Sequence, residues 1–511
     1  MKITLISLSE DIAALGLRYL SAYLKRHGHD VRLIFLRGHT QKTGFVYQYS
    51  EKILEEVTAL CQNSDLIGIS VYTNYYDRVV QLTKWLKQQL KTPIIWGNLH
   101  ATVRPEDSLK YADMVCVGEG EGALLELADK IANHEDYSEV QNIWLKINGE
   151  IKKNPHRALI QDLDSLPFAD YNLDDDYVLE GEEFVQVKVD NFPDYLPKTF
   201  DKDHNLKVSF GFLGSRGCPH ACTYCGNNVR KQLYEGQRYL RFRSAENIVR
   251  ELKLRLKQFP YIEMFSFIDD AFTAQPLEEI EKFCQLYKEE INIPFRCFAS
   301  PMTLTAEKLD LLIDAGLQHI GIGIQSGSDR MQKFYKRYNN AEKILTAGQL
   351  LKKHRVNIAP PCYDIIVDNP YEKNEDYIET LKLLIQIPKP YHLSLFSIVF
   401  YPGTEMNKIA TEDGLLKDEI EEVSRKSWGL PDFSGINLIF YLISFNGNFK
   451  WLAKYFANEK RLEFINKKSR YKIWRPLFTV AKIFFLGKET IKAIFRGDII
   501  KKIRWVFESK G

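Results

Sequence analysis

Apolar and polar positions alternate with two different periods along residues 1–135. Runs that are apolar almost throughout, as expected for buried strands, lie at 2–7, 30–36, 65–72, 93–98 and 113–120. Between them apolar residues recur every three or four positions, which is typical of a helix with one buried face. Strands joined by helices predict a parallel, doubly wound sheet, because each connection must cross a face of the sheet. Ligands of such sheets bind beyond the carboxyl ends of the strands.

The same alternation resumes after a polar, Asp-rich stretch at 161–176. Six strand-like runs follow, at 207–213, 263–270, 295–300, 319–326, 359–368 and 392–400. Six repeats of strand and helix predict an incomplete β/α barrel, whose chemistry lies on loops at the carboxyl ends of its strands. We therefore expect an α/β protein with a doubly wound domain at 1–140, a linker at 141–207, a partial (β/α)6 barrel at 208–405 and a helical, basic region at 406–511.

Composition favours a folded protein of a reducing compartment. The chain has 511 residues, of which 45% are hydrophobic, and its eight cysteines are too few for a disulfide scaffold. The N-terminal stretch lacks the basic start and apolar run of a signal peptide. No run approaches the roughly 20 apolar residues of a membrane-spanning helix. We expect a cytoplasmic protein.

Positive charge is concentrated at the end of the chain. Residues 450–511 hold 17 Lys and Arg but only 5 Asp and Glu, whereas the whole chain has a net charge of +2. Two interpretations fit this basic, amphipathic pattern: helices packed over the barrel, or a helix that rests on the anionic inner membrane surface. We expect no nucleic-acid partner, because no recognition motif accompanies the charge. The apolar positions of the pattern are Ile491, Ile494, Phe495, Ile499, Ile503 and Phe507.

Three cysteines are close together directly after the first strand of the predicted barrel. They are Cys218, Cys222 and Cys225, in the spacing C-x3-C-x2-C. Thiolates are soft ligands, and this spacing lets successive sulfurs converge, so the stretch predicts a metal centre. Zinc would take His220 as a fourth ligand, but no second ligand pair occurs at a suitable spacing. A 4Fe-4S cluster held by three cysteines would leave one iron open for a substrate or cosubstrate.

The cysteine motif, with Tyr224 before its last member, resembles that of the radical S-adenosylmethionine superfamily. The resemblance implies a 4Fe-4S cluster that cleaves S-adenosylmethionine to a 5′-deoxyadenosyl radical. Many relatives have Glu where this chain has Gln325, so a carboxylate contact becomes an amide contact. Asp269 and Asp270 also suit a helix cap. The residues implied to bind S-adenosylmethionine are Tyr224, Asp269, Asp270, Ser300, Gln325, Ser326, Pro402, Gly403 and Thr404.

The N-terminal domain resembles the cobalamin-binding domain that precedes the radical domain in one branch of that superfamily. The segments that carry the resemblance are 15–31, 97–107 and 117–122, with Gly97-Asn98 where relatives usually have two glycines. The D-x-H-x-x-G signature of a histidine ligand is missing, which implies that side chains of the domain cover the lower face of the cofactor. A domain that has lost its cofactor is the alternative. The implied cobalamin-binding residues are Ser70, Gly97, Asn98, His100, Ala101, Gly118, Glu119, Gly120 and Glu121.

Together these resemblances imply cobalamin-dependent methylation of an unactivated carbon in a small-molecule or lipid-like substrate. Two molecules of S-adenosylmethionine would be consumed per methyl group, and a flavodoxin or a ferredoxin would donate electrons. Relatives with the same pair of domains include a cyclase that transfers no methyl group, so cyclization or rearrangement is the main alternative. A nonenzymatic cobalamin or redox sensor is a third interpretation. No catalytic residue is assigned from the sequence.

Overall fold

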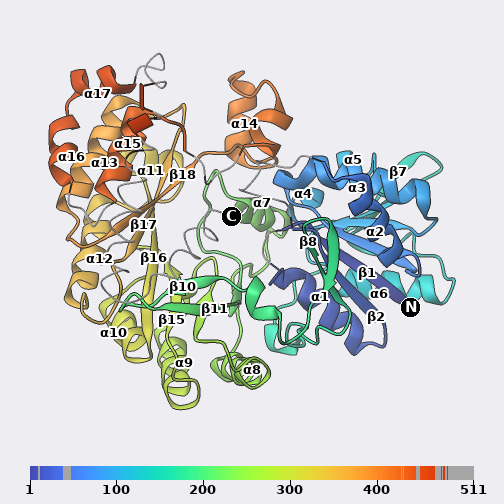
Figure 1. Cartoon of the computed structure of the whole chain (residues 1–511). Helices are drawn as coiled ribbons and strands as arrows, with labels where there is room; N and C mark the ends of the chain where they lie inside the picture. The colour runs from blue at the N-terminus through green and yellow to red at the C-terminus, as the bar shows by residue number, and fades with distance from the viewer. Residues whose placement is uncertain are drawn as a thin grey trace.

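The protein was analysed as a computed structural model (Figure 1). It describes residues 1–9, 12–37, 48–426, 429, 431–444, 449–466 and five positions between 473 and 480. The predicted amphipathic tail at 491–507 lies outside these described residues. Two sheets, each flanked by helices, dominate the arrangement in Figure 1, and α7 (Gly226–Leu233) lies between them.

The N-terminal sheet has the predicted doubly wound topology. Its central strands β1 to β5 are parallel, in the order β5-β4-β3-β1-β2. The apolar face of α1 is buried against the sheet through Leu17 and Leu24, which explains its three-to-four-residue period. The strands and helices are β1 (Lys2–Ser7), α1 (Leu15–Arg26), β2 (Asp30–Phe35), α2 (Glu51–Cys61), β3 (Leu66–Ser70), α3 (Tyr76–Gln89), β4 (Ile94–Gly97), α4 (Asn98–Val103), α5 (Pro105–Ser108), β5 (Met114–Cys116) and α6 (Glu121–Ala132).

The stretch predicted as a linker extends this sheet at both edges. Strands β6 (Ile143–Ile147) and β7 (Glu150–Lys153) add one hairpin beside β5, and β8 (Asp176–Glu180) and β9 (Glu183–Gln186) add another beside β2. Asp176 accepts a hydrogen bond from the buried guanidinium of Arg18 at 2.9 Å. A carboxylate that looks like a linker residue in the sequence is thus neutralised by a distant arginine. The exact domain boundaries stay a prediction.

The second sheet is the predicted half-barrel. Its order is β10-β11-β14-β15-β16-β17-β18; the six strands from β11 to β18 are parallel, and β10 is antiparallel. The strands are β10 (Lys198–Phe200), β11 (Leu206–Phe212), β14 (Met264–Phe267), β15 (Phe295–Ala299), β16 (Leu317–Gln325), β17 (Cys362–Val367) and β18 (His392–Ser397), and a small ribbon pairs β12 (Ser215–Arg216) with β13 (Arg241–Phe242). The helices between them are α8 (Ala245–Gln258), α9 (Leu277–Glu290), α10 (Ala306–Asp314), α11 (Asp329–Phe334), α12 (Ala341–Lys353) and α13 (Asn374–Gln386).

The C-terminal region contacts both sheets. Its helices α15 (Gly435–Ile443), α16 (Lys450–Phe456) and α17 (Glu459–Asn466) pack against β18 and α13, at the left of Figure 1. Helix α14 (Glu405–Glu412) precedes a segment that reaches the N-terminal domain, where Arg425 pairs with Asp77 of α3 at 2.9 Å. Among the described residues, no helix is both long enough and apolar enough to span a membrane.

Candidate active site

The cysteine loop begins at a position that only glycine accommodates. Gly217 has a φ of +92°, and a Cβ there would lie 2.5 Å from the backbone oxygen of Tyr239. This glycine turns the chain from β12 into the loop that holds Cys218, Cys222 and Cys225. Helix α7 then starts at Gly226, directly after the third cysteine. The loop is therefore fixed at both ends by tertiary contacts and a helix.

All three cysteines line one cavity of about 340 Å³ at the mouth of the half-barrel. Among the described residues, no group of three His, Cys, Asp or Glu side chains has the spacing to hold a single metal ion. In a 4Fe-4S cluster each thiolate binds a different iron, so three separated sulfurs around one cavity fit the cluster better than zinc. The cavity is lined by Cys218, His220, Cys222, Tyr224, Cys225, Asn227, Ile268, Asp269, Asp270, Phe298, Ala299, Gly323, Gln325, Arg337 and Asp364.

One arginine of this cavity was not anticipated from the sequence. Arg337 lies with Nη1 3.6 Å from the Sγ of Cys222, and its Nη2 donates to the carbonyl oxygen of Gly323 at 3.1 Å. Burial raises the pKa of the Cys218 thiol to about 12, so this thiol is protonated near neutral pH when no metal is bound. The Arg337 guanidinium beside the sulfurs presents a cation to any anionic group in the cavity. Arg337 stands among other basic residues in the sequence, which hid its role.

Four of the residues predicted to bind S-adenosylmethionine line this cavity: Tyr224, Asp269, Asp270 and Gln325. The Asp269 side chain is turned toward the chain segment that precedes the cysteine loop. Its Oδ1 accepts hydrogen bonds from the Gly214 N–H at 2.9 Å and from the Ser215 hydroxyl. Burial raises the pKa of Asp269 to about 6. Asp269 therefore braces the turn that leads into the cysteine loop. The neighbouring Asp270 is exposed to the cavity.

The other five predicted residues lie outside the cavity lining; they are Ser300, Ser326, Pro402, Gly403 and Thr404. The hydroxyl of Thr404 caps α14 by accepting from the N–H of Asn407 at 3.2 Å. A Cβ at Gly403 would lie 2.8 Å from the Cβ of Val103 in α4, so this glycine allows close contact with the N-terminal sheet. These contacts indicate supporting roles in this structure, and cofactor contact by the five residues stays a prediction.

A second cavity, of about 350 Å³, lies where the two sheets face each other. Seven predicted cobalamin-binding residues line it: Ser70, Gly97, Asn98, Gly118, Glu119, Gly120 and Glu121. His100 and Ala101 are buried but are not among its lining residues. The Nδ1 of His100 is 3.1 Å from the Thr73 hydroxyl, and burial lowers the pKa of this histidine to about 4. His100 thus belongs to the interior of the N-terminal domain.

The backbone around this cavity explains two of the residues that carry the resemblance. Asn98 has a φ of +77°, a conformation that glycine adopts freely and asparagine tolerates. Its side chain donates to the Ser70 hydroxyl at 2.9 Å and accepts from Arg230 of α7 at 3.4 Å. Gly118 has a φ of +91°, and a Cβ there would lie 2.0 Å from the hydroxyl oxygen of Tyr234. These positions let the backbone approach a large cofactor and the opposite domain.

The deeper part of the second cavity is apolar. Its walls there are Leu5, Leu17, Leu20, Ile95 and Leu124, which come from β1, α1, β4 and α6. Such an apolar wall, formed by a sheet and two helices, suits the apolar surface of a bound ligand. Among the residues that the structure describes, no histidine lines this cavity. The lining therefore agrees with a cobalamin covered by apolar side chains on its lower face.

Four charged residues hold the two domains together at this cavity. Glu119 pairs with Arg241 at 2.7 Å and with Arg216 at 3.3 Å, and Glu121 pairs with Arg216 at 2.6 Å. Despite burial, which raises it, the pKa of Glu119 is lowered by its hydrogen bond with Arg241 and the nearby arginine charges. Arg216 directly precedes the turn into the cysteine loop. The network therefore connects the second cavity to the loop that carries Cys218, Cys222 and Cys225.

Glu119→Gln is expected to destabilise the contact between the domains. The change leaves Arg241, whose side chain is 2% exposed, without a carboxylate, and loss of one partner from a buried pair costs about 3–5 kcal/mol. Chemical denaturation should show this loss in the free energy of unfolding. Glu183→Gln is a matched control, because Glu183 pairs with Lys52 at an exposed site where a pair contributes at most about 1 kcal/mol. Equal effects of both substitutions would contradict the role of the network.

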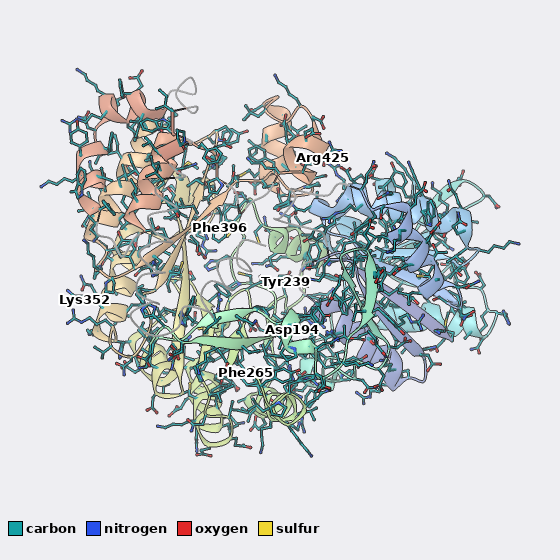
Figure 2. All side chains as sticks on the ribbon, viewed as in Figure 1. Asp194, Tyr239, Phe265, Lys352, Phe396 and Arg425 are labelled. Carbon is teal, nitrogen blue, oxygen red and sulfur yellow. The ribbon has the colours of Figure 1, made fainter. Side chains whose placement is uncertain are left out.

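The two cavities share part of their lining. Asn227 of α7 and Asp270, which follows β14, line both of them. Tyr239, which lines the second cavity, lies between the two sheets near the centre of Figure 2. Its hydroxyl donates to the Oδ1 of Asn227 at 2.8 Å. A group bound in one cavity therefore lies next to a group bound in the other, with few residues between them.

Comparisons with known proteins match both parts of the chain that line these cavities. Residues 1–128 match the B12 binding domain, and residues 213–384 match the Radical SAM superfamily. An uncharacterized methyltransferase of Pyrococcus horikoshii is 25% identical, over 79% of this chain and 79% of its own. An anaerobic magnesium-protoporphyrin IX monomethyl ester cyclase of Synechocystis is also 25% identical, over 79% of this chain and 74% of its own.

A solved structure has the same fold. It is the radical S-adenosylmethionine methyltransferase TsrM from Kitasatospora setae, with cobalamin and a 4Fe-4S cluster bound. The TM-score is 0.57 at 15% sequence identity, and the match covers 81% of this chain and 75% of that chain. The likeness extends over both sheets.

Proposed function

Because this chain belongs to the radical S-adenosylmethionine superfamily and carries a B12-binding domain before its radical domain, we propose that it methylates an unactivated carbon of a small-molecule substrate. The cofactors of these domains are a 4Fe-4S cluster, S-adenosylmethionine and cobalamin. When bound, they supply a 5′-deoxyadenosyl radical on one side and a transferable methyl group on the other. The resemblance seen in the sequence is confirmed by both family matches.

The wall shared by the two cavities is the observation that carries this proposal. Methyl transfer needs a substrate carbon that reaches both the radical and the methyl donor, and Asn227 and Asp270 mark where the two cavities adjoin. Cys218, Cys222 and Cys225 would hold the cluster. The Arg337 guanidinium fits the carboxylate of S-adenosylmethionine.

The chain's own residues also limit access to this region. Tyr239 and the buried pair of Glu119 and Arg241 fill the contact between the domains. Exclusion of water protects a reactive radical from side reactions. Asp270 is the accessible carboxylate at the junction, where it can orient a polar group of the substrate.

Product analysis tests the proposal. The protein would be purified without oxygen, reconstituted with iron, sulfide and cobalamin, and incubated with a reductant, S-adenosylmethionine and a fraction of cellular small molecules. We expect 5′-deoxyadenosine and S-adenosylhomocysteine in equal amounts, with a methylated acceptor detected by mass spectrometry. Formation of 5′-deoxyadenosine without S-adenosylhomocysteine would contradict methyl transfer.

Cyclization or rearrangement without methyl transfer is the second candidate function. It is favoured by the similarity to the Synechocystis cyclase, which covers as much of this chain as the similarity to the methyltransferase. Fold and cofactors do not decide between these reactions. The presence of S-adenosylhomocysteine among the products would indicate methyl transfer, and its absence would indicate cyclization or rearrangement.

The reaction also requires a reductant, for which we propose a flavodoxin or a ferredoxin. We place a peripheral contact with an anionic membrane surface at the C-terminal region. There Trp451, Tyr455 and Phe464 are exposed on α16 and α17, together with Lys454 and Lys460. Exposed aromatic side chains beside basic ones suit an interfacial contact with a lipid-like substrate pool.

A further inference from the structure

Strand β15 directs one arginine into the interior of the half-barrel. Phe295, Cys297 and Ala299 are buried on one face of this strand, and the alternation of side chains places Arg296 and Phe298 on the other. The Cζ of Arg296 lies 5.1 Å from the centroid of the Phe298 ring. Within the described residues, no hydrogen bond or ion pair reaches the Arg296 guanidinium. This group is therefore a cation without an ion-pair partner among the described residues, and the carboxyl of Asp364 attracts it from beyond ion-pair distance.

Three arginines that are more deeply buried than Arg296 are neutralised by carboxylates. Arg18 pairs with Asp176 at 2.9 Å, and Arg243 and Arg255 pair with Glu251 at 2.7 Å and 3.0 Å. Burial of a charge is unfavourable unless an opposite charge or hydrogen bonds compensate for it. Burial lowers the pKa of Arg296, because the surrounding groups stabilise the cation less than water would. An anionic ligand would supply the missing partner.

Arg296 lies close to the cluster cavity but not in its wall. Phe298, two residues further along the same face, lines that cavity, as does Asp364 of β17. Two glycines of β16 admit neighbouring side chains at this level, since a Cβ at Gly321 would lie 2.7 Å from the Phe298 ring and a Cβ at Gly323 would lie 2.6 Å from the Arg337 guanidinium. His319 pairs with Arg296 in the strand register, and burial lowers the histidine pKa to about 4. His319 is therefore neutral near pH 7 and does not repel an anion.

We propose that Arg296 binds an anionic oxygen group of the substrate, a carboxylate or a phosphate, and so selects the carbon that faces the cluster cavity. A guanidinium presents a planar fork of donors that matches both groups. Arg337 occupies the position beside the cysteine sulfurs, so the two cations serve different ligands. The assignment of the bound anion to the substrate rests on the proposed function, whereas binding of an anion by Arg296 does not. Arg296 is a specificity-determining residue in this scheme.

Chemical protection tests the site in the unaltered protein. The reconstituted holoenzyme, saturated with S-adenosylmethionine, would be treated with phenylglyoxal, and modification of Arg296 would be followed by peptide mass spectrometry. We expect inorganic phosphate or acetate to slow this modification by about tenfold at saturating anion, as for a charge-assisted contact. Arg250 is the internal control, because it lies 5.6 Å from the Phe168 ring at an exposed position. Equal rates with and without both anions would overturn the proposal.

A pair of variants provides the second test. Arg296→Gln is expected to weaken binding of the protecting anion by at least about tenfold in calorimetry, whereas Arg250→Gln leaves it unchanged. Cluster absorbance and corrin content, unchanged in both variants, would show that they fold. Unaltered anion binding in folded Arg296→Gln would overturn the proposal. Protection by phosphate but not acetate would identify a phosphorylated substrate, and the reverse would identify a carboxylate.

The outcomes separate this site from the proposed function. Protection of Arg296 without S-adenosylhomocysteine formation would leave the anion site in place and remove methyl transfer. Methyl transfer without protection of Arg296 would support the proposed function and remove the anion site. If both the anion site and methyl transfer are established, Arg296→Gln should raise the KM of methyl transfer for the substrate. The rate at which this variant forms 5′-deoxyadenosine in the absence of substrate should be nearly unchanged.

Discussion

Cys222→Ala is expected to abolish formation of 5′-deoxyadenosine. The substitution removes one of the three sulfurs that line the cluster cavity, and it also removes the partner of Arg337 at 3.6 Å. Even changes around a metal ligand lower activity about 10- to 100-fold, so loss of a ligand should exceed a hundredfold. The broad absorbance of the reconstituted cluster, near 400 nm, and the yield of 5′-deoxyadenosine measure the effect. The corrin bands should persist, because cobalamin would occupy the other cavity.

Cys284→Ala provides the matched control for this experiment. Cys284 is a buried cysteine of α9 that lines neither cavity. We expect its replacement to leave cluster absorbance and 5′-deoxyadenosine formation unchanged, with only the stability loss of a small cavity. A cluster of normal absorbance in Cys222→Ala would show that this cysteine is not a ligand. Simultaneous loss of the corrin bands would show that the two sites are not independent.

Gly118→Ala is expected to remove cobalamin binding. The added Cβ would lie 2.0 Å from the hydroxyl oxygen of Tyr234, which accepts a hydrogen bond from the Glu119 N–H at 2.8 Å. Tyr234 is buried and cannot move without disturbing the contact between the domains. Displacement of this wall should weaken binding by about a hundredfold, equivalent to about 3 kcal/mol. Corrin retained per protein after gel filtration, and titration with hydroxocobalamin, measure the change.

Gly28→Ala separates backbone strain from crowding. Gly28 has nearly the same φ, +88° against +91°, but a Cβ there meets no atom within 4 Å. The control therefore carries only the strain of the left-handed region, about 1–2 kcal/mol of stability, and should bind cobalamin normally. Normal corrin content in Gly118→Ala would refute the role of this position. Loss of corrin from both Gly118→Ala and Gly28→Ala would show that general destabilisation causes the effect.

The candidate site was predictable where its residues are close together in the sequence. Three cysteines within eight positions must lie close together in space, and all three line the first cavity. Gly118 to Glu121 lie in one loop after a strand, and all four line the second cavity. Residues assigned one at a time were less certain. The sequence does not tell which way an isolated side chain faces, and Ser326 is turned toward Thr380, with their hydroxyls 3.2 Å apart. His100 is likewise buried away from the cavity.

The sequence by itself determined the two sheets with their parallel strands and the close spacing of the three cysteines, because periodicity and spacing are local properties of the chain. Only the tertiary structure decided which charges meet. Arg18 and Asp176, or Glu119 and Arg241, are paired across more than a hundred residues, and no local pattern relates them. The same holds for Arg296, since its lack of an ion pair among the described residues is visible only in the folded chain. Long-range electrostatics depends on distances in space, and the folded chain alone defines these.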